Sequence, residues 1–393
     1  MKRVIFLVDM NAFFIGCEMT RKTELKLVPA AVAGDPKTRS GIVLSPNYEA
    51  RKFGVKTTML LHEARKLCPN IVFVPPDHRF YEDMSKQVME IFLRYAPVMQ
   101  QNSIDEAWLD LTGCELILGK PHEIAEKIMK DVQIELDLWC SIGISENKFL
   151  AKTASDMKKP LGITELWKED VEKKLWPLSV REMYGIGKQS EKKLNSLAIF
   201  TIGDLANYDK KLLMKEFGRF GEEIHKLANG IDNVKVECSS YSDTKSISRS
   251  TTLSADTIDF EHLTKILLEL AEEVGFDARQ QKYKGKTISI VVKFDDFQTI
   301  TRQKAVAPTY LTKEIYEVGV TLLKEHWDCK RPIRLIGIGL GGPGESKLQQ
   351  ISLFDLPTVE VDTKKEEKLE KTLDEIKEKY GLDSVKRAKL LPY

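Results

Sequence analysis

The stretch SIDEAWLD, residues 103–110, is the part of this sequence that most constrains the fold. It has the composition of a β-strand, yet two carboxylates, Asp105 and Glu106, stand side by side in it. Because strand side chains alternate between faces, Glu106 would share one face with Trp108, and Asp105 would share the other with Leu109. An ionised carboxylate is costly to bury without a partner. The stretch therefore requires a group that compensates both acids.

A preceding turn and a second apolar strand indicate what that group is. Polar residues 100–103 follow a strand around Val98, so the acid pair lies at or just after a turn, where both carboxylates can point the same way. RVIFLVD, residues 3–9, reads as a buried strand that also ends in an acid, Asp9. Three carboxylates on neighbouring strand ends favour Mg²⁺, and a pair of such ions suits phosphoryl transfer. The alternative is a surface aspartate and a solvated acidic turn.

Composition limits the class of protein but leaves its ligand open. The 393 residues suffice for two to four domains of an ordinary globular protein. We find no signal peptide and no run long enough to span a membrane. Six cysteines lie far apart without metal-binding spacing, which fits a reducing cytoplasm. The net charge is +1, and residues 241–345 carry 15 basic and 15 acidic side chains, so charge neither supports nor excludes nucleic acid as a ligand.

The order of elements predicts an α+β protein with several domains. Amphipathic helices alternate irregularly with short strands before residue 167, so we expect helices packed on one face of a sheet; the helices lie at 12–20, 57–68, 78–95 and 121–138. Residues 167–233 are mostly helical, and a polar, aperiodic linker follows at 232–245. The next segment has the order β-α-β-β-α-β, with strands 246–253, 286–294, 299–306 and 333–340 and helices 259–280 and 312–327.

Two basic segments have the chemistry of phosphate binding. SPNYEARKFGVKTTM, residues 45–59, brings Tyr48 and Arg51 close together, and arginine offers phosphate a bidentate fork. A solvated helix start would explain these residues equally well. DMKKPLG places Lys158 and Lys159 before a proline, although a lysine pair in such a turn usually faces solvent.

Three later segments are open to more than one interpretation. Gly185 and Gly187 in the sequence GIG let backbone amides approach a phosphate, with Lys188 following, or they form a plain helix–helix turn with a glycine cap. QISLF, residues 350–354, is an apolar pentad in a polar tail, which favours a docking peptide or a segment folded back onto the protein. The charged stretch 363–380 is a solvated helix, a disordered tail or a partner site.

Together these motifs resemble the Y family of translesion DNA polymerases, most closely the bacterial DNA polymerase IV type. Four segments resemble family motifs in chain order over about residues 3–235: VDMNAFF, SPNYEARKFGVKTTM, SIDEAWLDLTG and SIGISENKFLAKTASDMKKPLGI. The resemblance implies a right-hand polymerase with a β-α-β-β-α-β little finger. Its parts would be the palm (1–18 and 77–166), the fingers (19–76), a thumb with a helix-hairpin-helix (167–233), a linker (234–245), the little finger (246–345) and a tail with a clamp-binding peptide (346–393).

The resemblance also implies the roles of individual residues. The catalytic and metal-binding acids would be Asp9, Asp105 and Glu106, with the carbonyl of Met10 as a further ligand of two Mg²⁺ ions. Phe14 would be the steric gate that blocks a ribose 2′-hydroxyl, and the nucleotide contacts would be Phe13, Phe14, Ser45, Tyr48, Arg51 and Lys159. DNA would contact Gly185, Gly187 and Lys188. A β-type sliding clamp would bind Gln350, Ile351, Ser352, Leu353 and Phe354.

The implied activity is template-directed addition of deoxynucleotides to a primer, with low fidelity and across damaged bases. Primer–template DNA and a dNTP would be the substrates of a cytoplasmic monomer that binds no membrane. Asn11, Ala12, Ile42 and Leu44 differ from the residues of some relatives, which leaves the preferred lesion open. Two alternatives remain: a UmuC-like subunit that needs partners, and a catalytically weak factor that binds DNA and the clamp. The fingers motif and the helix-hairpin-helix disfavour a nuclease or cyclase with the same two-metal chemistry.

Overall fold

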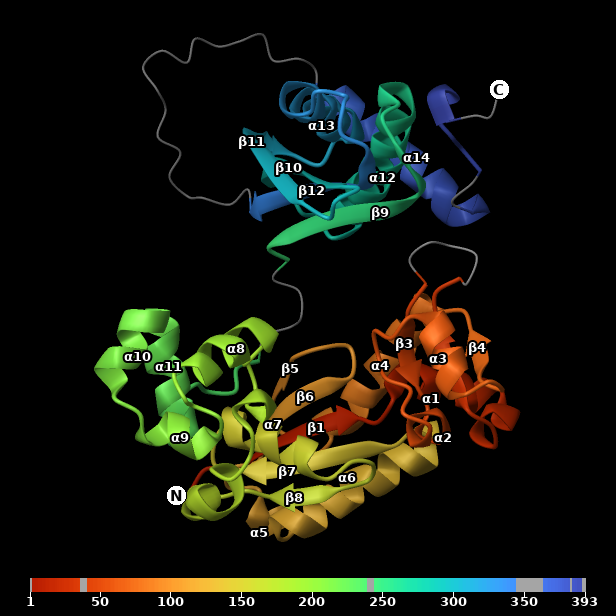
Figure 1. Ribbon diagram of the computed structural model, residues 1–393. Coiled ribbons are helices and arrows are strands. Elements are labelled where there is room, and N and C mark those ends of the chain that lie inside the picture. The colour runs from red at the N-terminus through yellow and green to blue at the C-terminus, as the bar shows by residue number, and fades with distance from the viewer. Residues whose placement is uncertain (1, 36–40, 239–243, 344–362, 382–383, 391–393) are drawn as a thin grey trace. The chain divides into compact units, whose positions relative to one another are not determined.

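The computed structural model describes residues 2–35, 41–238, 244–343, 363–381 and 384–390 (Figure 1). The chain forms two compact units, and the boundary between them in the sequence lies between Ser242 and Asp243. We call them the N-terminal unit and the C-terminal unit. In the residues that the structure describes, no helix is long and apolar enough to cross a membrane.

The N-terminal unit is built on a five-stranded sheet in the order β5-β6-β1-β7-β8. Neighbouring strands are antiparallel, except that β7 and β8 are parallel. The strands are β1 (Ile5–Met10), β5 (Val98–Gln101), β6 (Glu106–Asp110), β7 (Cys140–Ser145) and β8 (Ile163–Glu165). The central strand β1 is buried along its whole length, because helices cover both of its faces.

Alternate residues of β1 belong to two hydrophobic clusters. Phe6 and Val8 pack with residues of α1, α4 and α6, whereas Ile5 and Leu7 pack with Ala151 of α7. These helices are α1 (Phe13–Arg21), α4 (His78–Leu93), α6 (Pro121–Leu136) and α7 (Lys148–Met157). The prediction of helices on one face of the sheet is therefore wrong: because β1 is apolar on both sides, α7 covers the face opposite α4 and α6.

α7 packs closely on β7 because Gly143 has no side chain. A Cβ at Gly143 would lie 2.0 Å from the carbonyl oxygen of Ala151 and 2.4 Å from the amide nitrogen of Ser155. Asn147 caps the helix, since its Oδ1 accepts a hydrogen bond from the amide of Leu150 at 2.9 Å. The cap and the glycine together fix which side of α7 faces β1.

Two smaller parts complete the N-terminal unit. One is a three-stranded sheet in the order β3-β2-β4, with β2 (Ala30–Ala33), β3 (Val43–Pro46), β4 (Val72–Val74), α2 (Tyr48–Lys52) and α3 (Leu61–Leu67). The other is helical: α8 (Lys188–Ser196), α9 (Ile202–Asn207), α10 (Lys210–Phe217) and α11 (Arg219–Ala228). Short elements are η1 (Thr23–Lys26), α5 (Glu115–Leu118), η2 (Lys168–Asp170), η3 (Val171–Leu175) and η4 (Val180–Glu182).

α3 begins later than the sequence pattern predicts. The helical spacing starts at residue 57, whereas the helix starts at Leu61. Thr58 has a positive φ of 70°, and Leu60 forms an isolated β-bridge with Ile42, so these residues are held outside the helix. Tertiary pairing has overridden the local pattern here.

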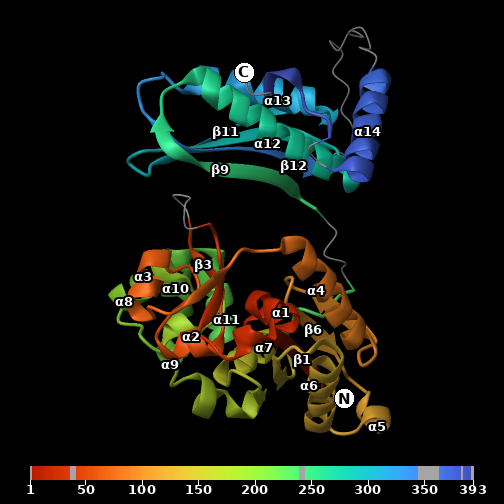
Figure 2. The ribbon, with the colours of Figure 1, turned by 90° about the vertical axis from the view of Figure 1, so that its right-hand side faces the viewer.

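The C-terminal unit is a four-stranded antiparallel sheet in the order β11-β10-β12-β9, with two long helices on one face (Figures 1 and 2). In chain order the elements are β9 (Ser246–Thr257), α12 (Phe260–Gln280), β10 (Gly285–Phe294), β11 (Thr299–Thr309), α13 (Thr312–His326) and β12 (Ile333–Pro343). Each matches an element of the predicted β-α-β-β-α-β order. Ile288, Ile290 and Val292 alternate into the core, which is the period expected of a half-buried strand.

A third helix of the C-terminal unit comes from the charged stretch near the end of the chain. α14 (Thr363–Tyr380) packs against α12 and the start of α13, and the short η5 (Ala388–Leu390) follows. None of the three interpretations drawn from the sequence describes this helix, because it is docked on the C-terminal unit of its own chain. The predicted clamp-binding peptide, residues 350–354, lies outside the described residues.

Candidate active site

The three candidate acids lie at the same end of the five-stranded sheet. Asp9, near the end of β1, is the register partner of Glu106, the first residue of β6. The turn before β6 is closed by the amide of Asn102, which donates to the carbonyl of Glu106 at 3.0 Å. Asp105 lies in that turn, and its carbonyl accepts a hydrogen bond from the amide of Met10 at 2.9 Å. Asp105 therefore precedes β6, and the alternation of side chains along that strand begins only at Glu106.

A lysine that the sequence analysis did not single out joins two of the carboxylates. Lys152 of α7 places its Nζ 2.9 Å from Oδ2 of Asp9 and 2.6 Å from Oε2 of Glu106, and its side chain is only 10% exposed. Lys159, in the loop after α7, places its Nζ 2.7 Å from the other oxygen of Asp9. Asp156 pairs with both lysines, at 3.6 and 2.8 Å. In the sequence, only the i,i+4 spacing of Lys152 and Asp156 indicated an ion pair on one face of a helix.

Burial and neighbouring charges act oppositely on the acids. Burial by itself raises the pKa of Asp9, but the ammonium groups of Lys159 and Lys152 outweigh it and hold that pKa below its ordinary value. Burial raises the pKa of Asp105, a hydrogen bond from the hydroxyl of Ser103 at 2.5 Å opposes the rise, and the charge of Asp9 adds to it. The lysines therefore favour the ionised form of Asp9, whereas burial disfavours the ionised form of Asp105, which a nearby cation would favour.

The residues present fit a divalent cation. Asp9 and Glu106 already enclose one positive charge, that of Lys152, with hard carboxylate oxygens of the kind that bind Mg²⁺ and similar ions. Within the described ranges, no three His, Cys, Asp or Glu side chains converge as a finished ligand set. The carboxylates of Asp9 and Glu106 are instead directed at Lys152, so an ion bound between them would replace its ammonium group.

A cavity of about 250 Å³ opens beside Asp9 and Asp105. Its lining brings together the predicted nucleotide contacts, namely Phe13, Phe14, Ser45, Tyr48, Arg51 and Lys159, along with Met10. Glu106 is not among the residues that line the cavity, and it connects to it through Lys152 and Asp9. Segments far apart in the sequence thus form one acidic and basic pocket.

Phe14 is held in place by a stack of rings. Its ring is stacked on that of Tyr81, with the ring centroids 4.6 Å apart and the planes inclined by 15°. The ring of His78 packs against it at nearly a right angle, with the two centroids 5.8 Å apart. Tyr81 is fully buried and donates its hydroxyl hydrogen to Glu18 at 2.9 Å. Phe14 therefore presents a fixed wall to the cavity, and its supporting residues were not identified from the sequence.

Asn47 positions the basic side of the cavity. Its Oδ1 caps α2 by accepting from the amide of Ala50 at 2.8 Å, and its amide group donates to the carbonyl of Leu25 in η1 and to that of Val28 in the loop before β2. Arg51, one turn into α2, donates from Nε to the carbonyl of Pro46 at 3.0 Å and lies over the ring of Tyr48. Its guanidinium is thereby directed along the wall of the cavity, with further donors available to an anion.

Asn11 ties the loop that carries Lys159 to the end of β1. Its Oδ1 accepts a hydrogen bond from the amide of Leu161 at 2.9 Å, and its amide group donates to the hydroxyl of Ser141 at 3.1 Å. The same hydroxyl accepts from the amide of Gly162 at 3.2 Å. Asn11 therefore fixes the position of Lys159 relative to Asp9.

The predicted helix-hairpin-helix lies outside this cavity. Gly185 has a positive φ of 92°, and an added Cβ at Gly185 or Gly187 would meet no described atom within 4 Å. α8 begins at Lys188 directly after the second glycine. The turn is thus open on its outer side, and both interpretations drawn from the sequence still apply to it.

Comparison with known proteins identifies the family. Residues 8–156 match the impB/mucB/samB family, residues 168–199 match the IMS family HHH motif, and residues 244–353 match the impB/mucB/samB family C-terminal domain. A Clostridium kluyveri protein called DNA polymerase IV is 55% identical over all of this chain and 99% of its own length. One from Alkaliphilus oremlandii with the same name is 51% identical over the whole of both chains. A solved Y-family DNA polymerase chimera aligns with a TM-score of 0.78 at 28% identity, over 86% of this chain and 99% of its own. The chain belongs to the Y family of DNA polymerases.

Membership of the Y family confirms two predictions from the sequence. The first is the family itself, and the second is the multidomain α+β fold, whose C-terminal β-α-β-β-α-β segment coincides with the matched C-terminal domain. In this Y-family chain the cavity beside Asp9 is lined by residues from all four motifs, with Lys159 coming from the fourth in chain order.

Proposed function

We propose that this chain is a DNA-directed DNA polymerase that extends a primer along a template and copies past damaged bases. Its membership of the Y family and its 55% identity to a relative called DNA polymerase IV support this function. The observation that carries the proposal is the position of Asp9, Asp105 and Glu106 at one end of the sheet, beside a cavity lined by Phe14 and Lys159.

Asp9, Asp105 and Glu106, with the carbonyl of Met10, would hold divalent ions, and we expect two Mg²⁺. When bound, such ions would activate the primer 3′-hydroxyl and neutralise charge on the triphosphate and the leaving pyrophosphate. The residues contribute their positions: the neighbouring lysines keep Asp9 ionised, and Asp105 is a buried carboxyl group whose ionised form a nearby cation would favour.

Lys152 would keep the acids together before an ion arrives. Two carboxylates as close as those of Asp9 and Glu106 repel each other, and one ammonium group within hydrogen-bonding distance of both removes that repulsion. Lys152 thus acts as a positioning residue for the metal ligands.

The basic and aromatic walls of the cavity would bind the incoming nucleotide. Lys159 exchanges its contact with Asp9 for a phosphate oxygen, and Arg51 supplies a planar fork, with Tyr48 and Ser45 as further donors. Phe14, fixed by its stack on Tyr81, excludes a ribose 2′-hydroxyl. Phe13 forms part of the floor.

The remaining expectations concern partners. Gly185, Gly187 and Lys188 would contact the backbone of the duplex, since the turn is open on its outer side. Residues 350–354 would bind a β-type sliding clamp and raise the effective concentration of the enzyme on the template. The enzyme would act as a monomer in the cytoplasm.

Primer extension by the purified chain tests this function. We expect extension by the chain alone, with loss when divalent ions are chelated. Glu106→Gln should reduce the rate by at least about 100-fold while primer–template binding is retained. No extension by the unmodified chain would favour the UmuC-like or non-catalytic alternatives. Extension by Glu106→Gln at close to the unmodified rate would remove that residue from the mechanism.

A further inference from the structure

α14 docks on the C-terminal unit without joining its hydrophobic core. Among the described residues, the buried apolar cluster of this unit has no member from α14. The most buried side chains of the helix are two acids one turn apart, Glu370 and Asp374, exposed to 8% and 6%, whereas Leu369 is 59% exposed. Docked helices usually present an apolar stripe. α14 is held instead by ion pairs and hydrogen bonds.

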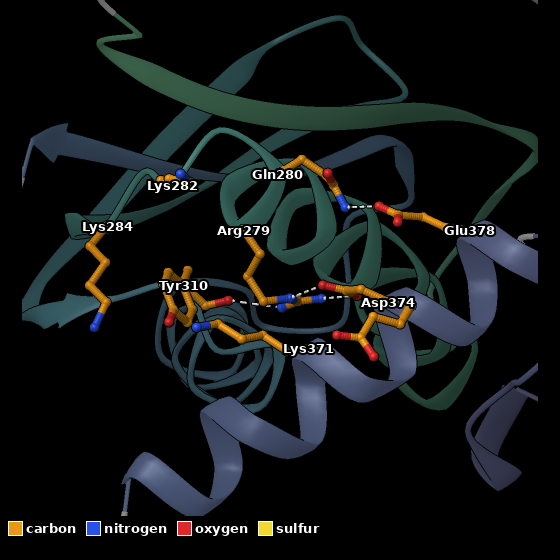
Figure 3. Close-up of a pocket in the computed structure, with 9 residues that line it drawn as sticks. Arg279, Gln280, Lys282, Lys284, Tyr310, Lys371, Asp374 and Glu378 are labelled. Carbon is orange, nitrogen blue, oxygen red and sulfur yellow. Dashed lines mark hydrogen bonds and ion pairs between the residues drawn. The ribbon is translucent and has the colours of Figure 1, made fainter.

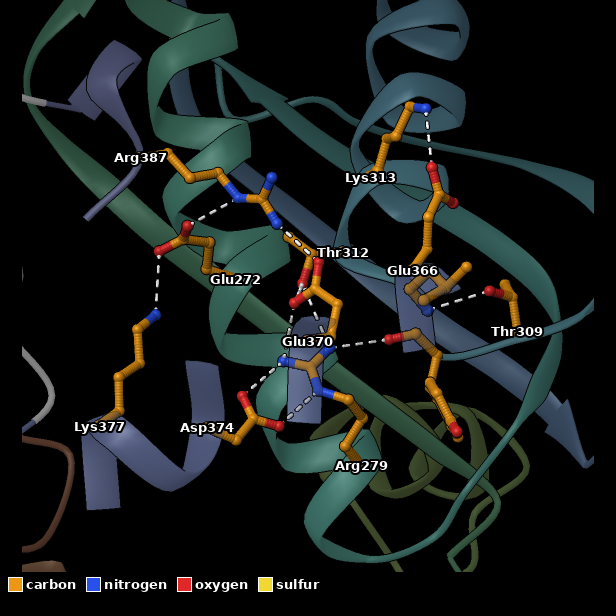
Figure 4. A network of polar contacts seen from close by, with 12 residues as sticks. Glu272, Arg279, Thr309, Thr312, Lys313, Glu366, Glu370, Asp374, Lys377 and Arg387 are labelled. Carbon is orange, nitrogen blue, oxygen red and sulfur yellow. Dashed lines mark hydrogen bonds and ion pairs between the residues drawn. The ribbon is translucent and has the colours of Figure 1, made fainter. Parts of the chain in front are cut away.

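Arg279 of α12 is the centre of this contact (Figure 4). Its Nε and Nη2 bind the two oxygens of Asp374 at 2.6 and 2.9 Å, and its Nη2 lies 3.3 Å from Glu370. Its Nη1 donates to the carbonyl of Tyr310 at 3.1 Å and to the hydroxyl of Thr312 at 3.3 Å. The side chain is only 5% exposed, so α14 covers a guanidinium that the rest of the unit provides with neutral acceptors.

Two more acids extend the row toward the start of α14. Lys284 pairs with Glu367 at 2.7 Å, and the hydroxyl of Tyr310 donates to the same carboxylate at 3.0 Å. Lys313 pairs with Glu366 at 3.1 Å. From position 366 to 374 the helix thus presents a row of carboxylates about 12 Å long, at about 1.5 Å per residue. Each carboxylate meets a donor from the C-terminal unit.

A cavity remains open along this contact (Figure 3). It measures about 470 Å³, and its lining includes Arg279, Lys282, Lys284, Tyr310 and Lys371. The helix and the unit are therefore not closely packed there, and the open space is lined by basic side chains together with the acids Asp374, Glu375 and Glu378.

The opposite end of the helix has contacts of reversed sign. Glu272 of α12 accepts from Lys377 at 3.5 Å and from Arg387, beyond the helix, at 2.9 Å. Arg387 also contacts Glu370 at 2.7 Å. The carboxylates that meet Arg279, Lys284 and Lys313 thus lie between positions 366 and 374, and beyond them Glu378 accepts a hydrogen bond from the neutral amide group of Gln280.

Contacts of this kind contribute little net free energy. Half-exposed pairs such as Lys313–Glu366 are weak and are screened by salt. The attraction in a buried pair such as Arg279–Asp374 is largely offset by desolvation of both charges. A second polyanion can therefore compete with the carboxylates of α14.

We propose that Arg279, Lys284, Lys313 and Tyr310, which we call the basic seam, form a binding site for the backbone of single-stranded DNA, and that α14 is a tethered competitor for it. Arginine forks, lysines and tyrosine hydroxyls bind phosphate oxygens by the contacts that they make here with carboxylates. Single-stranded DNA matches the basic seam because it presents one row of phosphates, and the seam now binds one row of carboxylates of α14. The site is additional to the proposed active site and depends on no step of polymerisation.

The test removes two carboxylates of the competitor from the full-length chain. In Glu366→Gln/Glu367→Gln, the buried pair of Arg279 with Asp374 stays intact. We expect the variant to bind labelled oligothymidylate several-fold more tightly at low salt than the unmodified chain. The slope of log K against log salt should steepen by about 1.4, because the two lysines that lose their carboxylate partners contribute about 0.7 each. The matched control is Glu261→Gln/Glu325→Gln, which removes the same charge from exposed positions on α12 and α13.

Two further measurements locate the effect. Adding Lys284→Gln and Lys313→Gln to the variant should return the affinity to that of the unmodified chain. Oligothymidylate should also increase amide exchange in α14 while exchange in α12 stays slow, which shows that the unit remains folded. An equal gain in the control pair, no gain at all, or unchanged exchange in α14 would overturn the proposal. Displacement of α14 by polyglutamate as effectively as by DNA would also overturn it, in favour of a site for acidic protein.

Discussion

Asp9 and Glu106 lie opposite each other on β1 and β6, and a single ammonium group, that of Lys152, contacts both carboxylates. The protein therefore provides its own cation at the point where the proposed mechanism needs divalent ions. This arrangement keeps two acids close together in the absence of metal, and it predicts that the lysine and the metal compete.

Lys152→Met should separate stability from metal affinity. Leaving the buried carboxylate of Glu106 without its ammonium partner, and Asp9 with Lys159 alone, should lower the free energy of unfolding of the metal-free protein by about 3 kcal/mol. Removing a nearby positive charge should at the same time strengthen metal binding, so the rise in Tm on adding Mn²⁺ should be larger than in the unmodified chain. For Lys152→Arg, which keeps the charge, both the metal-free stability and the rise in Tm on adding Mn²⁺ should lie between those of Lys152→Met and the unmodified chain. A Lys152→Met variant with unchanged metal-free Tm would show that the bridge contributes nothing.

Phe14→Ala should admit ribonucleotides. An apolar wall rejects an added hydroxyl by about 100-fold, so the preference for deoxynucleotides in kcat/KM should fall by about that factor. Tyr81→Phe is the matched control, because it keeps the stacked ring and removes only the hydroxyl bond to Glu18. If both variants discriminate as the unmodified enzyme does, Phe14 is not the gate.

Asp105→Asn should stabilise the metal-free protein as it removes activity. Burial raises the pKa of Asp105, so its ionised form opposes folding: the cost is absent below the ordinary pKa of 3.8 and is fully present above the raised pKa. With ions chelated, the Tm of the variant should therefore exceed that of the parent at neutral pH, and the difference should vanish in acid. Asp83→Asn, at an exposed position, is the control. A lower Tm for Asp105→Asn at neutral pH would contradict this account.

Gly143→Ala should disrupt the support of the active site. The added methyl group would lie 2.0 Å from a backbone oxygen of α7, and overpacking of this kind costs about 1–3 kcal/mol or more. Urea denaturation measures the loss. Gly187→Ala, which places a methyl group in open space at a negative φ, should change stability by much less. Equal effects of the two substitutions would mean that α7 can move away from β7 without cost.

The sequence predicted the parts of the fold that local patterns determine. The strand ends carrying Asp9 and Glu106, and all six elements of the β-α-β-β-α-β segment, follow from apolar periodicity and the turns between elements. The position of α7 could not be predicted, because a β1 buried on both faces shows no alternation that assigns a helix to either side. Lys152 was missed for the same reason, since its role depends on the face to which α7 packs.

The docking of α14 was hidden by its composition. A helix whose buried positions are Glu370 and Asp374 has the sequence pattern of a solvated helix. These acids are buried because they pair with Arg279, which is far away in the sequence. The family resemblance named most of the residues that line the cavity beside Asp9, and their roles there stay predictions. Its supports, Asn11, Asn47 and Tyr81, act through contacts that sequence spacing does not reveal.

The central claim is that Asp9, Asp105 and Glu106 together hold the divalent ions of the reaction. The most direct measurement is the number of Mn²⁺ ions bound per chain, counted by electron paramagnetic resonance in a complex with a 3′-dideoxy-terminated primer–template and the next dNTP. We predict two ions for the unmodified chain and at least one fewer for Asp105→Asn and for Glu106→Gln. Two ions of unchanged affinity in both variants would contradict the claim.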